Sequence, residues 1–263
     1  MLLRPASDMS LTPIEWLWPG YLPVGSLAIL DGDPGLGKSL LTLDLAARLT
    51  TGRPWPDGAP SPGPAPVLLL GNEDPDCVIK ARLTSLGADM PRIYPWTGAG
   101  ELPLPRFPKD IRLLDQVLAE TRAKFVIIDP VVAFLDGSVI SYSDASVRCA
   151  LHPLAQLAEK HRAAILLVRH LNKDNGPHAL YRGGDSIGFV AACRLAWLAG
   201  RDPRMEERLV LAQTKNNFAP RQPSLAYLLP KDAPRIDWQG PSAWNADDLT
   251  VRRPCPRDRK SVV

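Results

Sequence analysis

The chain has 263 residues, and its 31 Lys and Arg residues against 28 Asp and Glu residues leave a formal net charge of +3. This small excess does not by itself indicate a nucleic-acid-binding protein, although the total would hide a local basic patch. No run of about 18 apolar residues is present, which excludes a membrane-spanning helix, and the first ten residues lack a secretory signal. The 4 cysteines form no CxxC pair, so we expect neither a disulfide framework nor a zinc site, and a cytoplasmic protein fits.

Apolar runs of strand length alternate with stretches of helical spacing between residues 27 and 170. Strands are predicted at 27–31, 67–70, 92–96, 125–129 and 164–169. Helices are predicted at 38–50, from Pro75 to about Gly87, at 109–122 and at 144–161. Asp74 is the expected cap of the second helix. Later strands, expected to be antiparallel, are predicted at 192–199, 208–214, 224–229 and 235–238.

This alternation predicts an α/β fold with a mainly parallel central sheet flanked by helices and with antiparallel strands at its C-terminal end. Residues 1–20 are interpreted as an N-terminal arm, residues 21–239 as one domain and residues 240–263 as a polar, basic, disordered tail. Ligands of such sheets bind beyond the carboxyl ends of the strands. Polar residues that follow the predicted strands are therefore the first candidates for a site.

The strand at 27–31 is followed by a segment that fits the phosphate-loop pattern GxxxxGK[ST]. Its glycines allow successive backbone N–H groups to point at phosphate oxygens, and the next helix directs its N-terminus at the anion. Lys38 is expected to reach the β- and γ-phosphates of ATP, and the Ser39 hydroxyl to bind Mg²⁺. The predicted binding segment consists of Gly32, Asp33, Pro34, Gly35, Leu36, Gly37, Lys38, Ser39 and Leu40.

Three further strand ends carry candidate catalytic groups. Asp129 ends an apolar strand, as does the carboxylate that holds Mg²⁺ in many phosphate-loop enzymes. Pro130 follows it, so the base that activates water must come from elsewhere, and Glu73 is the best candidate. His170, after the strand 164–169, is expected to sense the γ-phosphate.

These residues together resemble the RecA-like P-loop ATPases. Gly25-Ser26-Leu27, Glu73-Asp74-Pro75, Arg82-Leu83, Arg169-His170-Leu171-Asn172-Lys173 and Arg182-Gly183-Gly184 look like the RepA-type branch, with its hexameric plasmid helicase and the AAA_25-like ATPases. The resemblance covers about residues 20–230. It implies a homo-oligomeric, hexameric ring with ATP and Mg²⁺ at subunit interfaces. It also implies a cation from the neighbouring subunit at the γ-phosphate, for which Arg194 and Lys215 match the region; each also fits an ordinary surface residue.

The loop 171–186 contains Lys173, Tyr181, Arg182 and two adjacent glycines. Such a loop is suited to contact single-stranded DNA through phosphates and a stacked base, although a mobile active-site flap has the same composition. The leading interpretation is an ATP-hydrolysing motor on single-stranded DNA that serves a plasmid, phage or mobile element. A DNA-independent regulatory or recombination-mediator ATPase is the alternative. A small-molecule kinase or a module without turnover fits less well.

Overall fold

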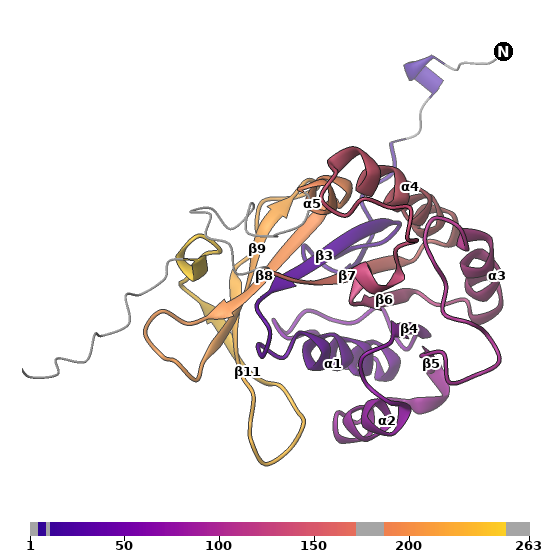
Figure 1. Ribbon diagram of the computed structural model, residues 1–263. Helices are drawn as coiled ribbons and strands as arrows, with labels where there is room; N and C mark the ends of the chain where they lie inside the picture. Colours follow the sequence, from indigo (N-terminus) through magenta and orange to yellow (C-terminus); the bar gives the residue numbers. More distant parts are fainter. Residues whose placement is uncertain (1–4, 9–10, 172–186, 251–263) are drawn as a thin grey trace, which may run out of the picture.

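A computed structural model of the chain describes residues 5–8, 11–171 and 187–250. Its centre is a sheet of nine strands in the order β11-β10-β9-β8-β3-β7-β6-β4-β5 (Figure 1). The strands are β3 (Ser26–Gly32), β4 (Val67–Gly71), β5 (Ile93–Trp96), β6 (Phe125–Asp129), β7 (Ala164–His170), β8 (Leu195–Arg201), β9 (Leu209–Asn216), β10 (Ser224–Leu228) and β11 (Asp237–Ser242). A separate two-stranded sheet pairs β1 (Trp16–Trp18) with β2 (Leu22–Pro23).

The helices are α1 (Lys38–Thr51), α2 (Asp76–Ser85), α3 (Ile111–Thr121), α4 (Asp144–His161) and α5 (Gly188–Ala192). Short 3₁₀ helices lie at Ala6–Asp8, Met90–Arg92, Val131–Phe134 and Asp248–Thr250. None of the helices in these described ranges is long and apolar enough to cross a membrane. The predicted α/β architecture is confirmed, and the elements expected between residues 27 and 170 begin and end within a few residues of their predicted bounds.

The strands from β8 to β5 run parallel, whereas β9, β10 and β11 continue the sheet in antiparallel order. The strand predicted at 192–199 begins later, at Leu195, because residues up to Ala192 belong to α5. It pairs antiparallel with β9, as predicted, but on its other side it runs parallel to β3. Phe189 and Val190 of α5 are buried, so this helix acts as the crossover that a parallel connection requires.

The central strands are buried on both faces, as parallel strands between two helical layers must be. Ala28 and Leu30 of β3 face a core shared with α1, whereas Leu27 and Ile29 face a second core shared with α3 and α4. Figure 1 shows α1 and α2 on one side of the sheet and α3, α4 and α5 on the other. The polar loops at the strand ends are thus carried by a sheet that is packed on both faces.

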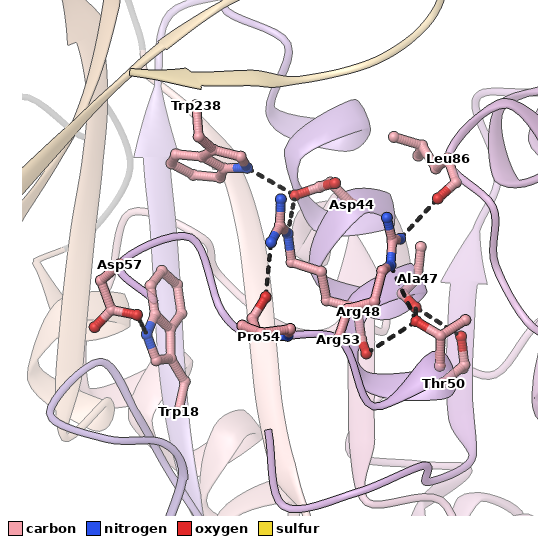
Figure 2. Close-up of polar contacts among 11 residues, drawn as sticks. Trp18, Asp44, Ala47, Arg48, Thr50, Arg53, Pro54, Asp57, Leu86 and Trp238 are labelled. Atoms are coloured by element: carbon pink, nitrogen blue, oxygen red, sulfur yellow. Dashed lines mark hydrogen bonds and ion pairs between the residues drawn. The ribbon is translucent and has the colours of Figure 1, made fainter. Parts of the chain in front are cut away.

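Helix α1 is tied to its surroundings by polar contacts (Figure 2). The Trp238 indole N–H donates to Asp44 Oδ2 at 2.8 Å, and Arg48 Nε donates to the same oxygen at 2.8 Å. Arg48 also donates to the carbonyl of Pro54, which fixes the loop that follows the helix. Asp44 is only 3% exposed, so these two donors satisfy a buried carboxylate and attach α1 to β11.

Residues on both sides of the predicted domain boundaries at 20 and 240 contribute to the packed structure. Trp18 is fully buried, with its ring centroid 4.2 Å from that of Tyr21 and 5.4 Å from that of Trp55. At the other end, Ala246 and Leu249 cover an apolar part of β8 and β9. The reason is physical: the apolar face of these strands has to be shielded from water, and the segment around the 3₁₀ helix Asp248–Thr250 does this.

Candidate active site

The predicted site residues gather at the carboxyl edge of neighbouring parallel strands. In the strand pairing, Gly32 at the end of β3 is opposite His170 at the end of β7, and Asp129 at the end of β6 is opposite Gly71 at the end of β4. Glu73 follows β4 by two residues. Since β3, β7, β6 and β4 are consecutive in the sheet, four segments far apart in the sequence meet here.

The segment 32–39 has the backbone of an anion-binding loop. Gly35 and Gly37 adopt positive φ angles of 79° and 70°, a conformation that L side chains rarely adopt. A Cβ at Gly32 would lie 2.8 Å from the carbonyl oxygen of Ala199, so only glycine fits there. The N-cap of α1 is Gly37, which has no side chain to cap the helix, so the first N–H groups are suited to bind a ligand.

The Lys38 side chain folds over the loop that precedes it. Its Nζ donates to the carbonyl oxygens of Gly32 at 2.7 Å and Asp33 at 2.9 Å, and lies 3.0 Å from His170 Nδ1. An ammonium group has only donors, so this contact places the lone pair of Nδ1 toward Lys38. Burial lowers the pKa of Lys38, whereas Asp129 and other nearby carboxylates oppose that shift. The lysine is thus held beside the position where a phosphate would bind.

Asp129 and Ser39 offer oxygen atoms that are suited to bind a metal ion. Asp129 Oδ1 is buried and has no hydrogen-bond partner within the described ranges. Burial raises the pKa of the Asp129 carboxyl, and a hydrogen bond from Ser39 opposes the shift. A buried oxygen without a partner beside a hydroxyl suits Mg²⁺, which takes few protein ligands and completes its shell with water and phosphate oxygens. The donor set therefore fits the expected metal.

Glu73 and His170 face each other across the mouth of the site. Glu73 Oε1 lies 3.9 Å from His170 Nε2, and both side chains are partly exposed. A cavity of about 50 Å³ is lined by Glu73, Ser39 and Asp129 among others, which is enough for a water-sized group. These positions are those that a base for water activation and a phosphate sensor need.

Asp74 does not cap α2, so that prediction is wrong. The helix starts at Asp76 after Pro75, without a capping side chain. Asp74 instead accepts two hydrogen bonds from Arg82, at 2.5 and 3.3 Å. A bidentate guanidinium contact competes well with a single backbone N–H for a carboxylate, and it ties the segment after Glu73 to the body of α2.

Arg194 and Lys215 lie at the opposite edge of the sheet. The backbone N–H of Arg194 donates to the carbonyl of Leu27, near the start of β3. Arg194 and Arg148 line a cavity of about 370 Å³ at this edge. Lys215 Nζ donates to the carbonyls of Val190 at 2.9 Å and Cys193 at 2.7 Å, so it closes the C-terminal end of α5.

A buried ion pair between β3 and β7 lies next to the site, and no sequence motif indicated it. Arg169 Nε and Nη2 donate to the two oxygens of Asp31, each at 2.8 Å, and the guanidinium carbon lies 5.0 Å from the centre of the Phe189 ring. Both residues precede site residues by one position. The available signal was a charged residue at the end of each of two apolar strands.

Comparison with known proteins identifies the family. The sequence matches AAA_25, described as an AAA domain, over residues 4–176. The chain belongs to this family. The match contains the segment 32–39, Glu73, Asp129 and His170, and it ends before α5 and β8–β11. Together with the fold, it establishes a RecA-like P-loop ATPase architecture.

Curated relatives of this AAA_25 chain are DNA repair proteins RadA. The chain is 27% identical to RadA of Halalkalibacterium halodurans over 189 residues, 70% of this chain and 37% of that protein. It is 27% identical to RadA of Synechocystis over 222 residues, 77% and 38% of the two chains. For RadA of Bacillus subtilis the identity is 25% over 173 residues, 64% and 33% of the two chains. The chain thus spans about a third of the length of these relatives.

Proposed function

We propose that this AAA_25 chain is a Mg²⁺-dependent ATPase that acts on single-stranded DNA. The observation that carries the proposal is the convergence of Lys38, Asp129 and Glu73 at one edge of the sheet, with an uncapped helix N-terminus between them. Phosphoryl transfer to water needs a phosphate cradle, a metal and a group that orients water. Each of these has a candidate here.

The chain's own residues divide the work as follows. Lys38 leaves the carbonyls of Gly32 and Asp33 and donates to the phosphates instead. Ser39 and Asp129 would hold Mg²⁺, which supplies charge neutralisation at the phosphates. Glu73 accepts the proton of the attacking water. His170, released by Lys38, is free to donate to the γ-phosphate and so to report its presence.

Single-stranded DNA as the substrate is supported by the relatives, whose name is DNA repair protein RadA. Lys173 and Arg182, the predicted DNA contacts, lie outside the described residues. The motifs quoted above favour a replicative helicase or translocase of the RepA-type branch. The alternative is a DNA-independent regulatory or recombination-mediator ATPase, and the RadA relatives, named DNA repair proteins, support its recombination-mediator form. Stimulation of ATP hydrolysis by single-stranded DNA is expected for the motor, whereas indifference to DNA favours the regulatory alternative.

A homo-oligomeric ring, hexameric by analogy with the RepA type, is part of the proposal. A strand of seven residues is roughly 20 Å long, so Arg194 at the far edge is too distant to serve the phosphates of its own chain. Its position beside Arg148 in the lining of the cavity at this edge suits contact with the nucleotide of a second copy. Lys215 is the weaker candidate for this role, because its Nζ already donates to backbone carbonyls.

The deciding experiment measures ATP hydrolysis by the purified chain with and without single-stranded DNA. Glu73→Gln should abolish turnover and keep ATP binding, whereas Glu120→Gln, an exposed change on α3, should leave both turnover and ATP binding unchanged. An inactive Arg194→Ala variant mixed with an inactive Glu73→Gln variant should regain activity at about a quarter of the interfaces if sites form between copies. Full activity of Glu73→Gln would refute the catalytic assignment, and absence of recovery in the mixture would refute the shared site.

A further inference from the structure

The phosphate-loop segment, residues 32–39, is in contact with the C-terminal hairpin, which consists of β10 and β11. The hydroxyl of Tyr227, on β10, donates to the carbonyl oxygen of Leu36 at 2.9 Å, and Tyr227 is fully buried. Leu229, just after β10, packs against Gly37, where an added Cβ would lie 2.8 Å from its methyl carbons. The hairpin thus contacts two consecutive residues of the loop.

A second contact attaches the same hairpin to the helix that follows the loop. Tyr227 is paired with Trp238 of β11 in the strand register, and their ring centroids are 5.5 Å apart. The indole of Trp238 donates to the buried carboxylate of Asp44 on α1, as Figure 2 shows. Two neighbouring aromatic residues therefore each donate one hydrogen bond, one to the loop and one to α1.

The direction of the Leu36 carbonyl determines where the next amide points. A trans peptide is planar, and its C=O and N–H groups point in opposite directions. When Tyr227 draws the Leu36 carbonyl toward the hairpin, the N–H of Gly37 points away from it. This is an amide of the segment expected to bind phosphate, and glycine at this position has a positive φ angle.

We propose that Tyr227 is a positioning residue for nucleotide binding: its hydroxyl orients the Leu36–Gly37 peptide so that the Gly37 N–H faces the phosphates. The proposal rests on the ATP site proposed above. The hairpin lies beyond residue 176, where the AAA_25 match ends. Tyr227 touches no substrate, and its effect is expected in ATP affinity rather than in the rate of the bound complex.

The test compares Tyr227→Phe with Tyr21→Phe. Tyr21 is equally suited as a control because it is buried and its hydroxyl also donates to a backbone carbonyl, that of Pro223 at 2.7 Å, away from the phosphate loop. Titration with Mg²⁺-ATP, steady-state kinetics and thermal unfolding are measured for both variants. Tyr227→Phe should raise the Kd and the KM for ATP about fivefold, the factor that one net hydrogen bond is worth, with kcat within about twofold of the parent chain.

Tyr21→Phe should lower the midpoint of thermal unfolding about as much as Tyr227→Phe does. It should leave the affinity for ATP unchanged. Trp238→Phe keeps an aromatic ring at this position but removes the hydrogen bond to Asp44. It should also raise the Kd for ATP. Unchanged affinity in Tyr227→Phe, or an equal loss in Tyr21→Phe, would overturn the positioning role and leave the ATP site intact. A parent chain that binds no ATP would overturn the proposed function and this inference together.

Discussion

Replacement of Asp31 by Asn should strongly destabilise the fold, because it removes the negative charge from a buried ion pair with Arg169. Arg169 is 1% exposed and Asp31 is 7% exposed, and two hydrogen bonds of 2.8 Å join them. The arginine cannot release its proton to escape the penalty. Loss of one partner of such a buried pair costs about 3–5 kcal/mol, which for a domain of this size corresponds to a fall in thermal midpoint of about 6–20 °C.

The assay is thermal and urea-induced unfolding of the parent chain, of Asp31→Asn and of two comparison variants. Asp232→Asn breaks an exposed pair with Arg235 and should leave the thermal midpoint unchanged. The double change of Asp31→Leu with Arg169→Met removes both charges and should recover most of the lost stability. A loss below about 1 kcal/mol in Asp31→Asn, or a double variant as unstable as the single one, would refute the reasoning.

Three further predictions concern the site and its support. Asp129→Asn should raise the Mg²⁺ concentration needed for half-maximal hydrolysis by about tenfold or more, measured by metal titration at fixed ATP, and an unchanged requirement would remove Asp129 from the metal site. Arg82→Ala frees Asp74 and should lower kcat several-fold without loss of ATP binding, whereas Lys80→Ala on the same helix should not; equal effects in stopped-time hydrolysis assays would show that the ion pair does not support Glu73. Trp18→Ala removes the centre of a stacked aromatic cluster and should cost about 3–5 kcal/mol in urea unfolding; a cost near zero would mean that the N-terminal strand packs only loosely.

Much of the fold could be predicted because the parallel strands are nearly uninterrupted apolar runs. Phe125–Ile128 and Ala164–Val168 are buried on both faces, so uninterrupted apolar runs of strand length indicated them. The same logic located Asp129 and His170, since a polar residue at the end of such a run must lie at the edge of the sheet. The start of β8, next to α5, was harder to predict, because a short buried helix and a buried strand have similar composition.

Side-chain partners depend on tertiary contacts and could not be read from spacing. Asp74 fits a helix cap in the sequence, but Arg82 two turns later offers a stronger bidentate contact. The sequence predicts Lys38 as a phosphate ligand. In the structure its Nζ donates to the carbonyl oxygens of Gly32 and Asp33. Arg194 is a further example. Its charge within an apolar stretch suggests a function, but only the direction of β8 shows that it lies at the far edge of the sheet.

The C-terminal hairpin is the clearest case of information that lies between distant segments. Tyr227 lies in no recognisable motif. It is 191 residues away in the sequence from Leu36, whose carbonyl oxygen accepts its hydrogen bond. The antiparallel strands beyond β8 have to extend the sheet past β3 before Tyr227 can reach Leu36. A phosphate loop is recognised from its own eight residues, but the orientation of its amides also depends on what packs behind it. Tyr227 is therefore where a change outside the motif should be felt as a change in nucleotide affinity.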